Sequence, residues 1–393
     1  MSSNDIYLNS LGIINCLGTS KEEVIKSLLS NQTGLITTKE LISKRKTQIG
    51  CVDDKVLPEI PERLKKYECR NNQLALHACM QIDENINKVI NKYGVDRVSI
   101  VCGTSTSGID DGEKALTDKF LLDKFPEKFN YKQQETAGLS NFLKEYYQLQ
   151  SVAYTISTAC SSSGKAFASA ARLIKQDLCD AAIVVGCDTL CEMALNGFDC
   201  LDAISQELCL PFHNKRAGIN IGEGAAAFIL SKESSEISLL GVGESSDGYH
   251  ITAPDPSGEG AKLAMIRALE SAHLTNDNIG YLNLHGTATI LNDSMESNAV
   301  RDVFNTKIAC SSTKSLTGHT LGAAAATEVG MCWLLLSDIY NRQKKLPKQY
   351  SSDEDIIQDI GIITSDIRYQ KPNFMSNSFA FGGNNVSVII GKK

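Results

Sequence analysis

The feature that most constrains the fold of this chain is an internal repeat. Three segments of the first half recur in the same order in the second half: SIVCGTSTSGIDDGEKA resembles YLNLHGTATILNDSMESNA, ISTACSSSGKAFASAARLI resembles CSSTKSLTGHTLGAAAATEVG, and GINIGEGAAAFILS resembles NSFAFGGNNVSVIIG. Similar segments in a constant order indicate two copies of one βα unit. We therefore predict two tightly packed halves, 1–236 and 237–393, because no low-complexity linker separates them.

Strand-like and helix-like runs alternate within both copies, as in SVAYTIST followed by the Ala-rich run after Ser161. Such alternation predicts an α/β protein with mostly parallel sheets that are covered on both faces. The first copy also carries an additional segment, 108–147, that is rich in Lys, Phe and Tyr. An insertion of this kind commonly covers a site or forms an interface.

Charge and cysteine content restrict the classes of function. The net charge of −7 excludes general nucleic-acid binding, which needs a basic surface. No apolar run approaches the ~20 residues that span a bilayer, and the start MSSNDIYLNSLG has no signal-peptide pattern. Thirteen cysteines in such a chain predict free thiols in the cytoplasm. A zinc site is the alternative, but the densest group has no CxxC pair, which favours core packing: Cys179, Cys187, Cys191, Cys200 and Cys209, with His213 nearby.

Cys160 lies at a strand-to-helix junction and is followed almost entirely by small residues. A sulfur at a helix N-terminus meets unpaired N–H groups and the positive end of the helix dipole, which lower the pKa of a thiol. The same N–H groups can hold a negative oxygen during attack on a carbonyl. The alternative is a buried structural cysteine, so further residues must decide.

Three other segments place chemistry-bearing residues at matching points of the repeat. His285 ends an apolar strand, where α/β sheets place their sites. Lys314 and His319 stand five apart across a Gly/Thr turn that enters an Ala-rich helix, and Phe381 precedes two glycines. Each residue alone has an ordinary structural explanation, but their coincidence with Cys160 favours a shared site.

These motifs resemble those of the β-ketoacyl-[acyl carrier protein] synthases of the thiolase superfamily over essentially the full length. The family's T-A-C-S-S nucleophile motif matches 158–162, H-G-T-x-T matches 285–289, K-x-x-x-G-H matches 314–319, and F-G-G matches 381–383. The second histidine separates this type from the related Cys-His-Asn enzymes. The resemblance implies a thiolase-like fold with layers in the order α-β-α-β-α.

The resemblance also implies a decarboxylating Claisen condensation. A carrier-bound acyl thioester would acylate the Cys160 thiolate, and the backbone N–H groups of Cys160 and Phe381 would form the oxyanion hole. Malonyl-carrier would then lose CO₂ while His285 and His319 hold the enolate oxygen, and the carbanion would lengthen the chain by two carbons. Lys314, paired with Glu296, would supply a positive charge to the site and orient its groups. Thr287 and Thr289 would bind the pantetheine amides, and Phe381 would be the gate between the acyl pocket and the malonyl site. No metal or organic cofactor is implied.

Three departures from the family pattern affect the expected local structure. Ile290 stands where the family often has Pro, which alters the rigidity of that loop. Ala380 replaces a common Gly before the gate residue and should restrict the gate backbone. The segment 210–218, LPFHNKRAG, replaces the frequent R-P-F-D-x-x-R-D-G, which puts local salt links and carrier docking in question.

The implied partners are an acidic acyl carrier protein and a second subunit. A basic patch is expected to dock the carrier, and the candidates are Arg63, Lys65, Lys66 and Arg70 with Lys124 and Lys128, although a solvated helix face explains these charges equally well. CRNNQLALHA and LNGFDCLDAIS are similar to the bacterial aryl-polyene branch. The protein would then be a homodimer, or a heterodimer with a chain-length-factor-like subunit.

Two other classes of function remain as alternatives. A non-catalytic chain-length-factor or scaffold subunit typically lacks the nucleophile, whereas Cys160, His285, Lys314 and His319 are all present here. A thiolase or simple acyltransferase uses a second cysteine as base where this chain has a histidine. A cysteine protease needs Cys and His but explains neither the repeat nor the lysine loop.

Overall fold

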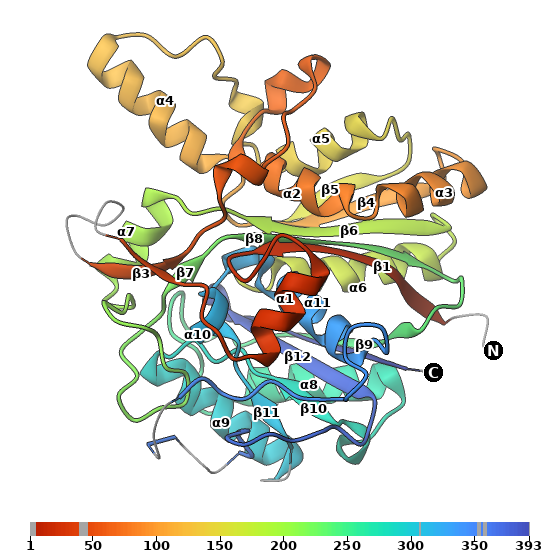
Figure 1. The fold of residues 1–393 in the computed structure, drawn as a ribbon, viewed down its shortest axis with the longest axis vertical. Coiled ribbons are helices and arrows are strands. Elements are labelled where there is room, and N and C mark those ends of the chain that lie inside the picture. The colour runs from red at the N-terminus through yellow and green to blue at the C-terminus, as the bar shows by residue number, and fades with distance from the viewer. Residues whose placement is uncertain (1–4, 39–45, 306–307, 352–354, 357–359, 393) are drawn as a thin grey trace.

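The computed structural model describes residues 5–38, 46–305, 308–351, 355–356 and 360–392. Its centre is a ten-stranded sheet with the order β11-β10-β12-β13-β9-β1-β8-β6-β4-β5 (Figure 1). The strands on the β1 side are β1 (Ile6–Asn15), β4 (Val98–Gly103), β5 (Ala153–Ile156), β6 (Ala181–Asp188) and β8 (Gly224–Ser231). The strands on the β9 side are β9 (Ile237–Ser246), β10 (Tyr281–Asn283), β11 (Cys310–Ser311), β12 (Asn373–Ala380) and β13 (Asn384–Lys392). Each repeat thus supplies one half of the sheet.

The halves of the sheet meet along a short seam, where β1 pairs with β9 only at Ile6↔Leu239 and Tyr7↔Ser238. Strands β4 and β6 are buried at every residue, as expected of strands covered on both faces. Strands β4 and β6 pair in parallel, as do β4 with β5 and β10 with β11 and β12. The prediction of mostly parallel sheets is nevertheless wrong, because five of the nine strand pairs that the described residues form in this sheet are antiparallel. Antiparallel pairs around β1, β8, β9 and β13 complete a mixed sheet.

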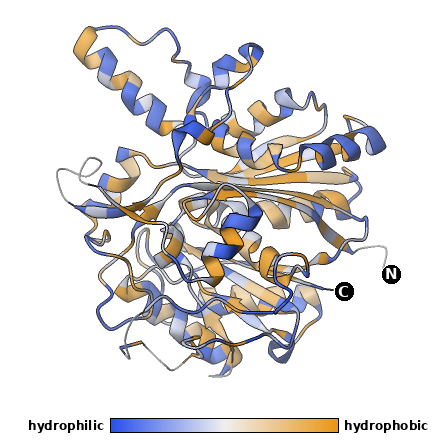
Figure 2. Cartoon of the chain, viewed as in Figure 1, coloured by the Kyte–Doolittle hydropathy of each residue, from blue (hydrophilic) through white to orange (hydrophobic). Residues whose placement is uncertain are grey.

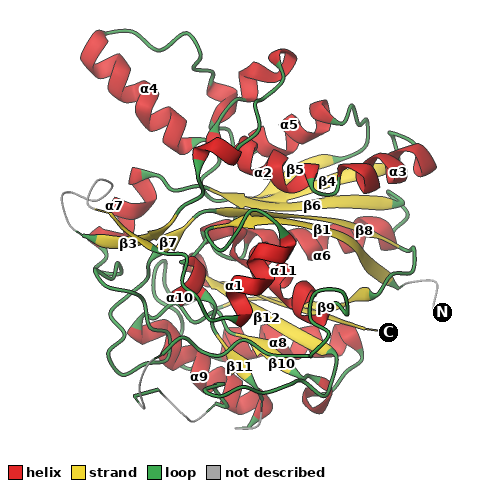
Figure 3. Ribbon diagram, viewed as in Figure 1, coloured by secondary structure: helices red, strands yellow, loops and turns green. Residues whose placement is uncertain are grey.

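Helices lie on both sides of each half-sheet and between the two halves (Figures 1 and 3). The outer helices are α2 (Arg70–Met80), α3 (Asp83–Tyr93) and α5 (Gly138–Tyr146) on the first half, and α8 (Glu259–Ala272) and α9 (Ile290–Phe304) on the second. The inner helices are α6 (Ser162–Lys175) and α11 (Ala324–Leu336), with α1 (Lys21–Leu29) beside them. The order of layers is therefore α-β-α-β-α, which confirms the thiolase-like fold.

The small residues after Cys160 allow close packing of α6 at the centre. A Cβ at Gly103 of β4 would lie 2.4 Å from the backbone of Ser163, and one at Gly164 would lie 2.5 Å from Val386 of β13. The hydroxyl of Ser163 accepts a hydrogen bond from the N–H of Ala326 on α11 at 3.0 Å. The two repeats are joined through these two helices.

Short elements complete the chain around this frame. They are β2 (Ile36–Thr38), β3 (Thr47–Gly50) and β7 (Ile221–Gly222), which form a small second sheet, and the helices α4 (Ile109–Leu122), α7 (Glu192–Cys200) and α10 (Lys314–Thr317). Helix α4 belongs to the insertion 108–147 and projects from the top of the molecule (Figure 1). Apolar residues fill the central layers and also lie along α4 (Figure 2). Among the described residues, no helix combines the length and apolar content needed to cross a membrane.

Candidate active site

Cys160 lies between β5 and α6, two residues before the helix begins at Ser162. The turn places Ala159 in the left-handed region with φ 50°, a conformation that costs a non-glycine residue about 1 kcal/mol. The hydroxyl of Ser162 donates to the carbonyl of Ala159 at 2.5 Å and thereby holds this turn. The side chain of Cys160 is 5% exposed and reaches the cavity described below.

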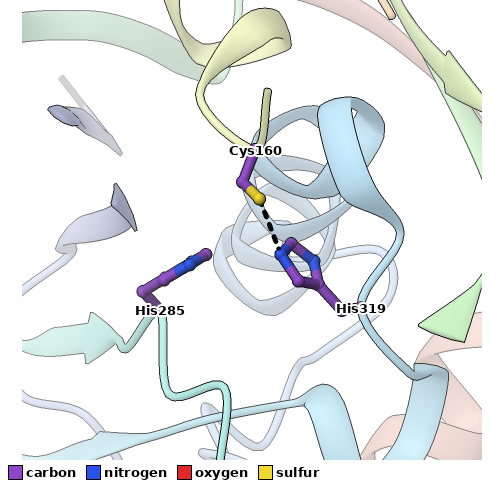
Figure 4. A group of neighbouring side chains, drawn as sticks. All are labelled: Cys160, His285 and His319. Atoms are coloured by element: carbon purple, nitrogen blue, oxygen red, sulfur yellow. Dashed lines mark hydrogen bonds between the residues drawn. The ribbon is translucent and has the colours of Figure 1, made fainter. Parts of the chain in front are cut away.

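The two predicted histidines converge on this thiol (Figure 4). His319 Nε2 lies 2.9 Å from Cys160 Sγ, and the rings of His285 and His319 are 5.3 Å apart at an interplanar angle of 81°. His285 follows β10, and His319 follows the short helix α10. All three residues therefore stand beyond the carboxyl ends of strands from both halves, where α/β sheets form their sites.

Lys314 lies beside His285, but its ion-pair partner differs from the prediction. Its Nζ is 3.5 Å from His285 Nδ1 and 2.5 Å from Glu328 Oε1, and both side chains of this ion pair are buried. The prediction that Lys314 pairs with Glu296 is therefore wrong. Glu328 lies on α11, where it is the single charged residue of an otherwise apolar or small helix (AAATEVGMCWLLL). A lone acid in such a helix was the signal that could have found it.

Glu296 supports His285 through the backbone instead. Its carboxylate accepts the N–H of His285 at 2.8 Å and that of Gly286 at 2.7 Å, and burial raises its pKa to about 7. Gly286 has φ 39°, and a Cβ there would lie 2.5 Å from Ser312, so the turn requires glycine. Glu296 is thus a support for the histidine loop.

The electrostatics of the site favour a neutral cysteine–histidine pair. Burial raises the pKa of the Cys160 thiol to about 12, although Lys314 and the residue's own N–H act in the opposite direction. Burial also lowers the pKa of His285 and His319 well below the usual value, and Lys314 lowers both further. The prediction of a low-pKa thiol is therefore wrong for this buried residue. A neutral imidazole at 2.9 Å can instead take the thiol proton as the sulfur attacks.

A cavity of about 360 Å³ opens over these three side chains. Thr287 and Thr289 line it, and their hydroxyls are 2.9 Å apart. Thr289 also caps α9, because its hydroxyl accepts the N–H of Asn292 at 3.3 Å. Ile290 is the first residue of α9, a position that favours proline but does not require it. The departure at Ile290 therefore leaves the helix start intact and adds an apolar side chain to the cavity wall.

Phe381 follows β12 and lies in the cavity wall, with its ring 5.3 Å from that of Phe198 on α7. The glycines after it, Gly382 and Gly383, have φ of 77° and 72°, which an L-residue rarely adopts. Ala380 before it has φ −107° and ψ 155°, an ordinary extended conformation. Alanine is therefore unstrained at this departure, and the turn takes its left-handed conformation from the two glycines. Phe198 was not identified from the sequence.

The departure at 210–218 makes an exposed ion pair between Lys215 and Asp355 at 3.4 Å and a second one to α9. Arg216 Nε lies 3.9 Å from the buried carboxylate of Asp293, which also accepts the N–H of Phe212 at 2.7 Å. Ala217 and Gly218 line the cavity. The segment therefore still joins the cavity wall to α9.

The residues suggested for carrier docking do not line the cavity. Lys65 pairs with Glu68 at 2.6 Å and Lys66 with Glu145 at 2.8 Å, while Arg63 donates to the carbonyls of residues 145 and 146. The remaining candidates lie in the insertion, where Lys124 is 3.7 Å from Glu127 and Lys128 is exposed. Arg70 binds the buried Glu223 and is an internal structural residue.

Within the described part of the chain, one group of side chains is close enough to hold a metal ion. It consists of Cys160, His285 and His319. Their donor atoms all lie within 4.8 Å of one another, and one thiol with two imidazoles is a ligand set that zinc accepts. The Lys314 ammonium beside His285 opposes a second cation.

The fold and the neutral cysteine–histidine pair place the protein among enzymes that work through an acyl-cysteine. Comparison with known proteins narrows this class. The family profile described as "Beta-ketoacyl synthase, N-terminal domain" matches residues 4–236, and the one described as "Beta-ketoacyl synthase, C-terminal domain" matches residues 237–347. The chain belongs to the β-ketoacyl synthase family of condensing acyltransferases.

Relatives cover nearly the whole chain. A 3-oxoacyl-[acyl-carrier-protein] synthase 2 from Coxiella burnetii is 29% identical over 100% of this chain and 99% of its own length. The protein of the same name from Staphylococcus aureus is 30% identical over 85% of each chain. Among solved structures, the ketosynthase ApeO in complex with its chain length factor ApeC from Xenorhabdus doucetiae is 42% identical, with a TM-score of 0.95 over 99% of this chain and 98% of that one.

Proposed function

We propose that the protein is a β-ketoacyl-[acyl carrier protein] synthase in which Cys160 carries the acyl group. The observation that carries this proposal is the 2.9 Å contact between Cys160 Sγ and His319 Nε2 at the wall of the cavity. As the sulfur attacks a carrier-bound acyl thioester, its proton passes to His319 and then to the departing pantetheine thiolate. The N–H groups of Cys160 and Phe381 hold the tetrahedral oxyanion.

The second half-reaction uses the same cavity. Malonyl-carrier loses CO₂, and the negative charge on its thioester oxygen is met by hydrogen-bond donors from His285 and from His319, whose proton moves from Nδ1 to Nε2 once the sulfur is acylated. The Lys314 ammonium, 3.5 Å from His285 Nδ1, donates to that nitrogen and so leaves the proton on Nε2, which faces the substrate. The carbanion then attacks the acyl-cysteine and expels the Cys160 thiolate, which takes a proton from solvent through His319, so the products are a β-ketoacyl-carrier two carbons longer, CO₂ and the regenerated thiol. Thr287 and Thr289 bind the pantetheine arm.

The pathway that we propose is the aryl-polyene one, in the cytoplasm. Support comes from the 42% identity to ApeO, against 29–30% for the 3-oxoacyl-[acyl-carrier-protein] synthases 2. None of the cysteines in the described part of the chain is in a disulfide, as a reducing compartment favours. The substrates would be unsaturated acyl chains on an acyl carrier protein, which docks on the patch of Arg63, Lys65, Lys66, Lys124 and Lys128.

The partner subunit that we propose is a chain-length-factor-like chain, because ApeO was solved in complex with its chain length factor. The surfaces that we assign to it are the exposed end of α4 and the free edge of β5. On α4, Phe120, Leu121 and Leu122 are 89%, 69% and 71% exposed, and β5 ends the ten-stranded sheet. Exposed apolar clusters and unpaired strand edges both mark association surfaces. Phe120→Glu should abolish a heterodimer seen by size-exclusion chromatography with light scattering, whereas Lys119→Glu on the same helix should not.

The test of the reaction is the mass of the carrier after incubation with acyl-carrier and malonyl-carrier, with the proposed partner present. Wild type should release CO₂ and leave a β-ketoacyl-carrier, whereas His285→Ala should still acylate Cys160 but fail to decarboxylate. An unacylated protein and no product, in the presence of the partner, would contradict the proposal and favour the non-catalytic subunit.

A further inference from the structure

The loop 103–107, which follows β4, has the same Gly-Thr-x-Thr pattern as the loop 286–289 of the second repeat. In the second repeat both threonines line the cavity. In the first repeat Thr104 and Thr106 are only 0% and 3% exposed and do not line it. The threonines of the first copy therefore do not contact the contents of the cavity, and their hydroxyls must bind another group.

The partner of these threonines is Asp188, the fully buried last residue of β6. Its Oδ1 accepts the hydroxyls of Thr104 at 2.5 Å and Thr106 at 2.8 Å, and the N–H groups of Ser105 and Thr106 at 2.8 Å each. Its Oδ2 accepts the N–H of Gly322. Each of these partners is a donor, which favours the ionised carboxylate, whereas burial raises its pKa.

Asp188 is thereby connected to the loop of His319. Gly322 belongs to the 3₁₀ turn Leu321–Ala323, which begins two residues after His319. A Cβ at Gly322 would lie 2.7 Å from Asp188 Oδ2 and 2.4 Å from the Ser105 hydroxyl, so the contact is possible only with glycine. The carboxylate therefore fixes the backbone that follows the imidazole.

Asp188 is also connected to the nucleophile. Ser105, whose N–H it accepts, donates its hydroxyl to the carbonyl of Ala159 at 3.3 Å. Ala159 is the residue with φ 50° that directs Cys160 into the cavity. The hydrogen bonds of Asp188 thus reach the backbone beside both members of the cysteine–histidine pair.

We propose that Asp188 is a positioning residue of the condensing site, which sets the separation of Cys160 Sγ and His319 Nε2 by holding the loops on either side. The inference rests on the proposed function of that pair. A negative charge here also carries a disadvantage, since Asp188 raises the pKa of the Cys160 thiol. Retention of an acid at this place is explained by the donors that it gathers from two loops, the one after β4 and the one after His319.

Asp188→Asn tests the proposal, because an amide of the same shape must turn an NH₂ group toward N–H or O–H donors. We expect condensation by the Asn variant to fall about 10- to 100-fold, the usual result of a misplacement near 1 Å. We also expect the pH midpoint of Cys160 alkylation by iodoacetamide, followed by peptide mass spectrometry, to move to lower pH as the neighbouring charge disappears. A residue that only stabilised the fold would lower the melting temperature without slowing condensation below that temperature, and the midpoint reports only the loss of the nearby charge.

Ser99→Ala is the matched control, because Ser99 is a buried residue of β4 whose hydroxyl bonds that of Ser151, at 2.9 Å, near the far end of the strand. It should lower stability and leave both the rate and the midpoint unchanged. An Asn variant with a rate of condensation within twofold of wild type would overturn the proposal.

Thr106→Val carries the test if the Asn variant does not fold. It removes one donor to Asp188 and keeps the charge, so we expect a smaller loss of condensation, about 3- to 10-fold, with the alkylation midpoint unchanged. Full activity of the Val variant would overturn the proposal. A wild type that condenses nothing would refute the proposed function, while the alkylation midpoint of Asp188→Asn would still test the placement of the charge.

Discussion

The two repeats have the same frame of strand, loop and helix, but they hold their reactive groups by different means. In the first repeat Cys160 is placed by a left-handed turn and by small residues that let α6 reach the centre, and the buried Asp188 acts on this turn indirectly, through Ser105. In the second repeat buried charges act directly: Glu296 holds the backbone of His285, and Lys314 pairs with Glu328 beside its ring. A nucleophile needs a fixed position, whereas an imidazole also needs a fixed tautomer, which neighbouring charges set.

Removing the reactive group of the first repeat should have the largest effect. Cys160→Ala should lower condensation by ~10³-fold or more, because no acyl-enzyme can form. Product formation on the carrier measures this loss. Cys332→Ala removes a buried thiol of α11 that lies outside the cavity, so it should cost ~1 kcal/mol of stability and leave the rate unchanged. Equal rates for the two variants would contradict the role of Cys160.

Breaking the charge pair of the second repeat should affect both stability and rate. Glu328→Gln leaves the Lys314 ammonium buried without its counter-ion, so we expect a loss of ~3 kcal/mol in the free energy of unfolding. The rate of malonyl-carrier decarboxylation should fall ~10- to 100-fold as His285 loses its fixed tautomer. The double variant Lys314→Met/Glu328→Leu should regain stability in urea unfolding but not the rate. Recovery of both would make the pair purely structural.

The pH dependence of decarboxylation and of Cys160 alkylation should distinguish the two repeats, with smaller changes in rate than the substitutions above. The pKa of His285 and His319 is lowered, so both stay neutral through the usual histidine range and protonate only well below it. Decarboxylation should therefore stay flat from pH 8 down to about pH 6 and decline only in more acidic buffer. The raised pKa of Cys160 places the change in its alkylation rate in a different pH range, because that rate should increase into the alkaline range toward about pH 12. A decarboxylation rate that halves near pH 6.5 would show ordinary histidines.

The gate turn should give the smallest effect. Ala380 is extended, so Ala380→Gly adds freedom mainly to the unfolded chain and should cost about 0.5–1 kcal/mol. Acylation of Cys160 should change less than ~3-fold. Gly382→Ala, at φ 77°, should cost ~1–2 kcal/mol and slow acylation more strongly. A larger change in acylation rate from Ala380→Gly than from Gly382→Ala would mean that the gate passes through backbone conformations that alanine cannot adopt.

The sequence was sufficient for the frame and for the identity of the reacting residues. Both the repeat and the strand-to-helix junction at Cys160 are local patterns, and local patterns survive in the fold. The convergence of Cys160, His285, Lys314 and His319 followed from their matching positions in the two copies. Their roles remain proposals.

Long-range electrostatics could not be obtained from the sequence. Glu296 lies on the helix that follows the motif 285–289, and Glu328 lies on the helix that follows His319. The sequence treats these two acids alike, and only packing decides which carboxylate faces the ammonium of Lys314. The direction of the Cys160 pKa shift was predicted wrongly for a related reason. A helix N-terminus lowers the pKa of an exposed thiol, but the layers around α6 bury this one, and desolvation is the larger effect.

The most direct test of the account is intact-protein mass spectrometry after incubation with an acyl-carrier thioester, followed by addition of malonyl-carrier. The account predicts one acyl adduct that maps to Cys160, is absent from Cys160→Ala, and is discharged as a product two carbons longer. An adduct that malonyl-carrier cannot discharge would contradict it and indicate simple acyl transfer.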